Sequence, residues 1–223
     1  MSASAVVEQR ALRSAGTSAA PIYRLVSRIL SDRGTGGTLL DVGCGRGDLW
    51  PHVADRFAEY HGADVICYDG FPDVGHFHHV DLDAGRVAVD DGFADVVVAV
   101  ETIEHLENPR AFARELTRLA KAGGWIVVTT PNQLSLLSKL TLSLRHEFSA
   151  FRAGNYPAHL TALLEVDLRR ITAECGWEDV DVEYTARGRM PGTGRHWPGW
   201  LSRRWPRGLS DNVAIIGRKP GPD

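Results

Sequence analysis

Short apolar runs alternate with longer amphipathic stretches along most of the chain. Five runs are typical of strands, and they follow one another as TLLDV at 38–42, ADVICYD at 63–69, HFHHVDLD at 76–83, ADVVVAV at 94–100 and WIVVTT at 125–130. Two more strands are expected near VDVEYTA at 180–186 and NVAIIGRK at 212–219. These runs are rich in Val, Ile and Leu, which is typical of strands that are buried on both faces of a parallel sheet.

The stretches between these runs carry apolar residues at helical spacing. Pro21 opens one helix, and Asn108 is a typical N-cap residue before a second proline-initiated helix at Pro109. Further helices are expected over 49–60 and over 165–175. Strands that alternate with helices of this length predict βαβ units, so the expected fold is a doubly wound α/β fold with a mainly parallel sheet.

Two segments depart from this alternation. The Ala- and Ser-rich residues 1–20 are expected to form a flexible N-terminus before a single domain over 21–223. Residues 133–160 are expected to be an insertion that forms a lid over the acceptor, and their leucines fit helical spacing and strand alternation equally well. A membrane-surface role for this segment is the weaker interpretation, because among residues 134–148 only Lys139 and Arg145 are basic.

A third unusual segment, 185–210, is strongly basic. It holds six arginines and no acid and so carries a charge of +6. The net charge of the whole chain is −3, which means that the remaining residues carry −9. Five glycines and three prolines argue against a regular element, and three tryptophans lie among the arginines. Arginine suits phosphate or carboxylate recognition and tryptophan stacks on rings. The segment is therefore either an acceptor-side loop for an anionic substrate or a solubilising hairpin between the last two strands.

Composition limits the possible classes of protein. The 223 residues are 43% hydrophobic and 24% charged, which is ordinary for a globular domain, and a net charge of −3 does not favour nucleic-acid binding. No window approaches the roughly 18 uninterrupted apolar residues of a membrane span. The three cysteines are far apart and form no CxxC pair, so a reducing, cytoplasmic location is expected.

The glycine-rich stretch GCGRGD directly follows the first strand. In such sheets a ligand binds at the carboxyl ends of the strands, where Gly43, Gly45 and Gly47 let the backbone turn and approach it closely. Asp41 would repel a pyrophosphate but suits a ligand with an ammonium or sulfonium group. Asp69, expected at the end of the second strand, could accept both hydroxyls of a ribose.

These stretches together resemble the class I S-adenosylmethionine-dependent methyltransferases. The resemblance rests on LLDVGCGRGDL, VICYDG, DDGFADVVVAVETIEHLENP and GGWIVVTTPN, and it covers about residues 22–132. It implies a Rossmann-like seven-stranded sheet with an antiparallel last strand. It also implies a set of residues that bind S-adenosyl-L-methionine: Asp41, Gly43, Cys44, Gly45, Asp69, Gly70, Asp81, Leu82, Val100 and Glu101.

The motif ETIEH at 101–105 places two carboxylates and an imidazole after the fourth strand. On a helical turn Glu101, Glu104 and His105 would share one patch facing the cofactor. His105 could then act as a general base towards a substrate hydroxyl, supported by the adjacent Glu104. Alternatively the three residues could hold Mg²⁺, Mn²⁺ or Zn²⁺, with His159 or His146 as a fourth ligand.

Two methyltransferase subgroups share the pattern E-x-x-E-H. One acts on small molecules and lipid-type precursors, similar to the O-methyltransferases of ubiquinone biosynthesis and their glycan and natural-product relatives. The other methylates the 2′-hydroxyl of RNA ends with a metal ion, but its aromatic DHxFEW motif is replaced here by RHEFSAF and YPAHLTAL. We therefore expect O-methylation of a small-molecule, lipid-linked or saccharide acceptor. The alternatives are RNA methylation and non-catalytic cofactor binding.

Overall fold

The computed structural model describes residues 7–8, 11–12 and 14–221, and the prediction of a flexible N-terminus lies partly outside these residues. The strands are β1 (Gly37–Val42), β2 (Phe57–Asp64), β3 (His76–His79), β4 (Ala94–Val100), β5 (Ala120–Pro131), β6 (Glu178–Tyr184) and β7 (Asn212–Arg218). The α-helices are α2 (Ala20–Asp32), α3 (Pro109–Leu119), α4 (Leu136–Arg145), α5 (Glu165–Glu174), α6 (Gly199–Arg204) and α7 (Pro206–Leu209). Three short 3-10 helices join them, at Trp50–His52, Ile103–His105 and Ala153–Asn155.

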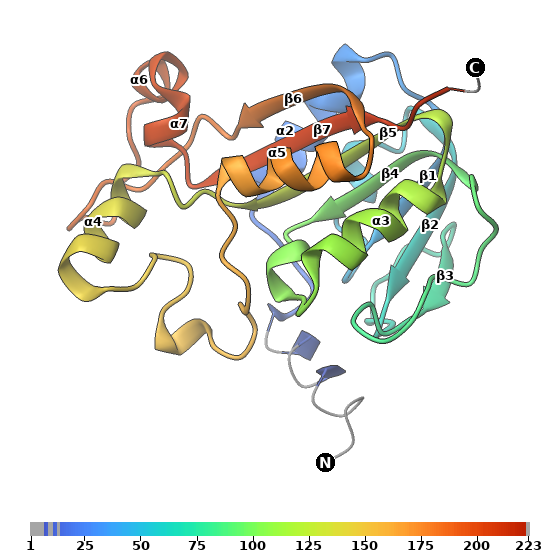
Figure 1. Cartoon of the computed structure of the whole chain (residues 1–223), viewed down its shortest axis with the longest axis horizontal. Helices are drawn as coiled ribbons and strands as arrows, with labels where there is room; N and C mark the ends of the chain where they lie inside the picture. Colours follow the sequence, from blue (N-terminus) through green and yellow to red (C-terminus); the bar gives the residue numbers. More distant parts are fainter. Residues whose placement is uncertain (1–6, 9–10, 13, 222–223) are drawn as a thin grey trace.

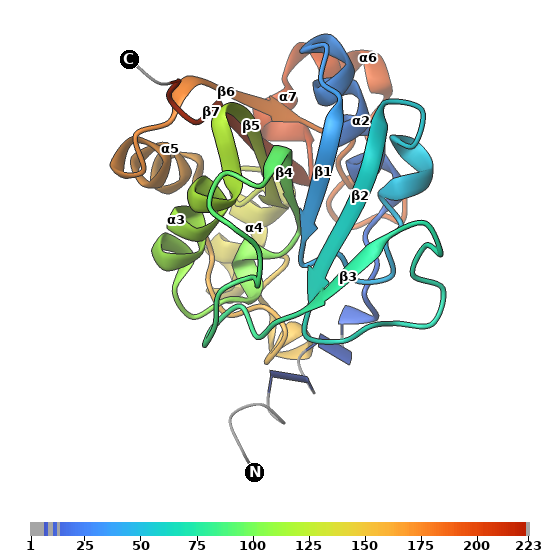
Figure 2. The same ribbon diagram turned by 90° about the vertical axis from the view of Figure 1, so that its right-hand side faces the viewer.

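The seven strands form one sheet in the order β3-β2-β1-β4-β5-β7-β6 (Figures 1 and 2). The strands from β1 to β5 pair in parallel, and β7 runs antiparallel to both β5 and β6. The predicted fold class is confirmed, including the antiparallel last strand. Strand order reverses at β1 and β4, and this reversal is where such sheets open a ligand crevice.

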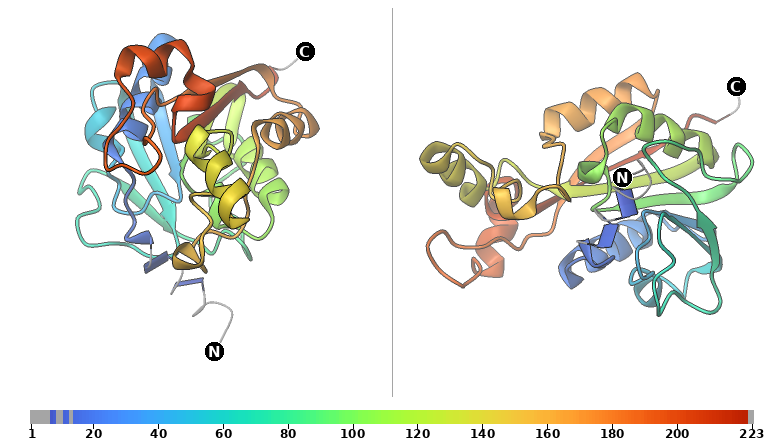
Figure 3. Two further views of the ribbon diagram at one scale, coloured as in Figure 1. Left: turned by 90° about the vertical axis from the view of Figure 1, so that its left-hand side faces the viewer. Right: turned by 90° about the horizontal axis from the view of Figure 1, so that it is seen from below.

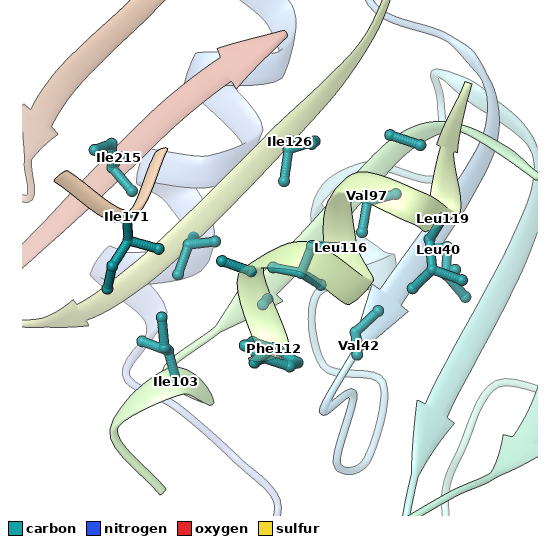
Figure 4. Close-up of a cluster of buried hydrophobic side chains, with 14 of the residues drawn as sticks. Leu40, Val42, Val97, Ile103, Phe112, Leu116, Leu119, Ile126, Ile171 and Ile215 are labelled. Atoms are coloured by element: carbon teal, nitrogen blue, oxygen red, sulfur yellow. The ribbon is translucent and has the colours of Figure 1, made fainter. Parts of the chain in front are cut away.

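The sheet has a hydrophobic core on each face, because successive strand residues point to opposite sides. On one face Leu40 and Val42 pack with Phe112 and Leu116 of α3 and with Ile171 of α5 (Figure 4). On the other face Leu39 packs against the apolar side of α2. Burial on both faces explains why the strands contain so few polar residues.

The second helix and second strand differ from their predictions. Residues 49, 53, 57 and 60 recur at helical spacing, yet only the short 3-10 turn Trp50–His52 forms, and the chain from Phe57 onward is β2. Tyr60 is buried between Trp50 and Phe71, with ring centroids 5.0 and 5.7 Å away. Packing across these rings therefore overrides the local periodicity, and β2 ends at Asp64 rather than at Asp69.

The insertion 133–160 and the basic segment 185–210 are more regular than the sequence indicates. Helical spacing describes the start of the insertion correctly, because α4 forms there with the Ser135 side chain as its N-cap. The basic segment contains the short helices α6 and α7, so the expectation of no regular element is wrong. Pro198 is the N-cap residue of α6, and Pro206 is the first residue of α7. Proline is tolerated at the start of a helix because an amide hydrogen there would have no acceptor within the helix.

Candidate active site

A cavity of about 500 Å³ opens at the carboxyl ends of β1, β2 and β4. This volume is in the usual range for a small-molecule site. Seven of the ten predicted cofactor residues line it, namely Asp41, Gly43, Cys44, Gly45, Leu82, Val100 and Glu101. The same cavity is lined by Glu104, His105 and His159, so most of the predicted residues are brought together.

The glycine loop forms the floor of one half of the cavity. Gly43 and Gly45 have φ angles of 78° and 52°, in the left-handed region that favours glycine. A Cβ atom would collide with the Thr102 side chain at Gly43 and with the Gly16 backbone at Gly45. Both glycines are therefore required by close packing as well as by conformation.

Asp41 is a buried carboxylate at the end of β1. Its Oδ2 accepts a hydrogen bond of 3.0 Å from the Tyr60 hydroxyl, while Oδ1 has no hydrogen-bond partner among the described residues. Burial raises the pKa of Asp41 to about 7. An unpaired buried carboxylate oxygen is well suited to a cationic group of a ligand, once the carboxyl group has lost its proton.

Asp64, and not Asp69, is the acid at the end of the second strand. Its Oδ2 accepts a hydrogen bond of 2.8 Å from the Gly45 amide, and its Oδ1 accepts one of 2.7 Å from the Val65 amide. Asp64 lines the cavity, whereas Asp69 and Gly70 follow β2 and are not among the lining residues. The sequence contained the signal, because Asp64 follows Asp41 by 23 positions, close to the roughly 20 residues typical of ribose-binding acids.

The stretch after β3 contributes Leu82 to the cavity as expected, but Asp83 takes the place expected for Asp81. Oδ1 of Asp81 accepts a hydrogen bond of 3.0 Å from the Asp83 amide, so it stabilises the turn. The side chain of Asp81 thus supports the wall of the cavity without being part of it.

The N-terminal segment also lines the cavity, which sequence reasoning missed. Gly16, Thr17, Ser18 and Ala19 all belong to the wall. The Gly16 carbonyl accepts a hydrogen bond of 2.9 Å from the amide of Arg46 in the glycine loop. No apolar period or motif marks these residues, so only the tertiary contact reveals their position.

Glu101 does not share a helical turn with Glu104 and His105. It has a φ angle of 52°, and the 3-10 turn begins only at Ile103. Its carboxylate accepts hydrogen bonds from the Thr129 hydroxyl at 3.0 Å and the Asn212 side-chain amide at 2.7 Å. Burial and then the nearby Glu104 raise the pKa of Glu101 well above its usual value. Glu101 therefore lines the cavity with its carboxylate bound to Thr129 and Asn212, and it does not belong to the group of possible metal ligands that Glu104 forms with His105 and His159.

Glu104, His105 and His159 form a compact cluster. One ligand atom from each lies within 4.8 Å of the others. Oε2 of Glu104 accepts a hydrogen bond of 3.1 Å from Thr130, whereas its buried Oε1 has no hydrogen-bond partner among the described residues. Burial raises the pKa of Glu104 and lowers the pKa of His159.

Both imidazoles are oriented by backbone carbonyls. Nδ1 of His105 lies 2.7 Å from the Ala158 oxygen, and Nδ1 of His159 lies 2.7 Å from the Ala150 oxygen. A carbonyl can only accept, so each Nδ1 carries the proton and each Nε2 carries the lone pair. His146, the other candidate ligand, ends α4 on the exposed surface and is not part of this cluster.

The far end of the cavity is built from the insertion 133–160 and the basic segment 185–210. Ser149 and Ala150 come from the insertion, and Arg189 and His196 come from the basic segment. The Arg189 guanidinium Nε donates to Oδ2 of Asp211 at 2.8 Å. Arg203 and Arg204 lie on α6 and do not line the cavity. The basic segment therefore reaches the cavity through Arg189 and His196, and not through the adjacent arginines Arg203 and Arg204.

Curated relatives match only part of the chain. An ubiquinone biosynthesis O-methyltransferase of Chromobacterium violaceum is 33% identical over 108 residues, which is 44% of this chain and 46% of that protein. A probable S-adenosylmethionine-dependent methyltransferase of Mycolicibacterium smegmatis is 32% identical over 120 residues, 51% of this chain and 45% of that protein. The chain thus spans less than half the length of these relatives.

Solved structures resemble the whole fold. A SAM-dependent methyltransferase from Archaeoglobus fulgidus has a TM-score of 0.61 at 19% identity, covering 88% of this chain and 94% of that one. A Burkholderia thailandensis 1,6-didemethyltoxoflavin-N1-methyltransferase, solved with bound 1,6-didemethyltoxoflavin and S-adenosylhomocysteine, has a TM-score of 0.60 at 12% identity over 89% of this chain and 78% of that one. The family model for the methyltransferase domain matches residues 12–182. The chain therefore belongs to the methyltransferase-domain family and has the fold of the S-adenosylmethionine-dependent enzymes.

Proposed function

We propose that the protein transfers the methyl group of S-adenosylmethionine to a hydroxyl of a small-molecule acceptor, with His105 as the general base. The observation that carries this proposal is the orientation of His105. Its Nδ1 donates to the Ala158 carbonyl at 2.7 Å, which leaves Nε2 as the basic nitrogen on a residue lining the cavity. Transfer from sulfonium to oxygen needs mainly alignment and removal of one proton.

The cofactor would occupy the half of the cavity beside the glycine loop. Asp41 would attract its cationic groups, and Asp64 would accept hydrogen bonds from the ribose hydroxyls in place of Asp69. The methyl group would then point towards the cluster of Glu104 and His105. Relatives named as ubiquinone biosynthesis O-methyltransferases support an oxygen acceptor on a small molecule.

A divalent metal ion is the second candidate for activating the acceptor. The donor set fits one, because Glu104, His105 and His159 each bring one ligand atom to within 4.8 Å of the others. Oε1 of Glu104 has no hydrogen-bond partner among the described residues, and both imidazoles are fixed by carbonyl acceptors, as metal-binding histidines usually are. Two nitrogens and one oxygen suit Zn²⁺ or Mn²⁺ better than Mg²⁺. Bound there, a metal would lower the pKa of an acceptor hydroxyl. Glu101 would not be a ligand, because Thr129 and Asn212 hold it.

Transfer of labelled methyl from S-adenosylmethionine into a cell extract tests the main proposal. We expect label in nuclease-resistant small molecules. Label that follows RNA instead, or no transfer at all despite tight binding of S-adenosylhomocysteine, would refute it. Calorimetry with Zn²⁺ and Mn²⁺ tests the metal independently of activity. Binding that is lost in His159→Ala and accompanied by chelator-sensitive transfer would assign the cluster to a metal, whereas no binding would leave His105 as a metal-free base.

A further inference from the structure

Two segments that are distant in sequence, 133–160 and 185–210, lie together at one end of the molecule. Figure 1 shows α4 beside α6 and α7 at the left, and the left panel of Figure 3 shows the same group facing the viewer. We call residues 133–160 and 185–210 together the basic end.

Helix α4 exposes four of its five leucines, and the fifth, Leu137, is half-buried. Its only fully buried residue is Ser138, whereas Leu136, Leu140 and Leu142 are 38–40% exposed and Leu144 is 78% exposed. The helix is held by polar contacts instead: the Ser138 hydroxyl donates to Gln133 at 3.0 Å and accepts from the Ser149 amide at 3.2 Å. This is the reverse of an ordinary surface helix, which buries its apolar residues against the core.

The exposed apolar side chains are concentrated at the basic end. Trp200 is 67% exposed, Trp205 is 54% exposed and Tyr156 is 66% exposed. Of the ten large apolar side chains exposed among the described residues, seven belong to the basic end. Concentration of this kind, unlike scattered single residues, marks an interaction surface.

Charge separates in the same way. Residues 133–160 hold three basic residues and one acid, and 185–210 holds six arginines and no acid, so the basic end carries +8 and the remaining chain −11. Arg203 and Arg204 are exposed, and no ion pair joins either of them to an acid within the part of the chain that the structure describes. The insertion alone is too weakly basic to attract anions, but its fold places it beside the arginines.

We propose that the basic end docks on an anionic lipid surface. Tryptophan and leucine side chains would enter the interfacial layer, and the arginines would face lipid phosphates. If two copies of this chain met through their basic ends, charges of +8 and +8 would repel each other. An anionic lipid surface therefore fits this end better than a second copy does. No described helix is long and apolar enough to cross a membrane, so docking would be peripheral.

Docking would also explain why the same segments form the far end of the cavity. His159, Arg189 and His196 all belong to the basic end and line the cavity. If the proposed function holds, a docked protein would present the end of the cavity proposed for the acceptor to the lipid surface, where amphiphilic acceptors collect.

Vesicle co-sedimentation of the full chain tests the proposal without cofactor or acceptor, so its failure is distinct from failure of the proposed activity. We expect binding to phosphatidylcholine vesicles that contain phosphatidylglycerol and much weaker binding to phosphatidylcholine alone. Arg203→Ala with Arg204→Ala should lower the partition coefficient about 30-fold, at about fivefold for each arginine. Trp200→Ala with Trp205→Ala should reduce binding that persists at high salt.

The matched control is Arg114→Ala with Arg170→Ala, which removes two exposed arginines from α3 and α5. This variant should bind vesicles like the wild type, and melting curves check that every variant is folded. Equal binding to both vesicle types, or an equal loss in the control, would overturn the proposal. So would competition by RNA at lower concentrations than by anionic vesicles, or a dimer in solution that the tryptophan substitutions dissociate.

Discussion

The two halves of the cavity are built in different ways. One half, proposed to bind the cofactor and called the cofactor half, is made mainly of strand ends and the glycine loop. The sheet itself sets these positions, because Asp41 precedes the last residue of β1, Asp64 ends β2 and Val100 ends β4. The other half, proposed to bind the acceptor and called the acceptor half, is made of connections after β5 and β6, which are fixed by side-chain and carbonyl contacts such as Ala158 to His105. The first half is thus a product of the fold, and the second is a product of the particular segments inserted into it.

The largest expected effect separates the halves at His105. His105→Ala removes the basic nitrogen and should lower the rate of methyl transfer roughly 10²–10⁴-fold. Cofactor affinity should stay within about twofold of the wild type, because Asp41, Gly45 and Asp64 remain in place. Steady-state rates and calorimetry with S-adenosylhomocysteine measure the two quantities on one protein sample.

A comparable loss of cofactor affinity in His105→Ala would show that the halves are not separable. His61→Ala serves as the matched control. It removes an imidazole from β2, where His61 and His78 of the edge strand β3 hydrogen-bond to each other at 3.1 Å, and neither residue lines the cavity. Transfer by this variant should match the wild type.

The second effect distinguishes Asp64 from Asp69 as the acid of the cofactor half. Asp64→Ala removes the acceptor proposed for the ribose and also the partner of the Gly45 amide at 2.8 Å. We expect the dissociation constant of S-adenosylhomocysteine to rise about 10- to 100-fold, as for loss of charged hydrogen bonds. Asp69→Ala should leave it unchanged, and a larger effect at Asp69 would restore the assignment made from the sequence.

The sequence specified the glycine loop and most strand ends of the cofactor half, but it missed Asp64 and residues 16–19, and it specified the acceptor half poorly. Local signals such as the glycine loop, the Val-rich β4 and the Asn108 N-cap predict their elements directly, because each depends on neighbouring residues. Asp64 was missed because Tyr60 packs between aromatic rings and shifts the strand towards the N-terminus, which is a tertiary effect. The pairing of His105 with His159, 54 positions later, depends on where the insertion folds back.

The position of Arg189 shows the same limit. The six arginines of the segment 185–210 are equivalent by composition. Arg189 is placed at the cavity by tertiary contacts, namely an isolated antiparallel β-bridge with His196 and a hydrogen bond to Asp211. Composition therefore indicated the chemistry of the segment but not the residue.

A third effect concerns pH and again belongs to the cofactor half. Burial raises the pKa of Asp41 to about 7, so the folded protein holds a proton there at pH values at which the unfolded chain has lost it. A cationic ligand favours the ionised carboxylate, so binding below pH about 7 requires loss of this proton. Affinity for S-adenosylhomocysteine should fall by up to about tenfold for each pH unit below 7.

Calorimetry over a pH series measures how the affinity for S-adenosylhomocysteine depends on pH. Asp41→Asn should bind this ligand more weakly, and its affinity should depend much less on pH. An unchanged slope in Asp41→Asn would assign the proton to another group. The folded protein alone should show the opposite trend. The raised pKa of Asp41 stabilises the fold below pH about 3.8, and this contribution is lost as pH rises through about 7.

The smallest effect tests the acceptor half at Arg189. Its side chain is 46% exposed and already paired with Asp211, so solvent and the carboxylate both weaken its attraction for an anionic acceptor. Arg189→Ala should therefore raise the KM of an anionic acceptor only about fivefold, with little change in kcat or in cofactor affinity. Arg195→Ala, in the same segment but outside the cavity wall, is the matched control. If both variants shift KM equally, the segment acts through its overall charge. If neither does, the acceptor is neutral and Arg189 serves to hold Asp211 and the start of β7 in place.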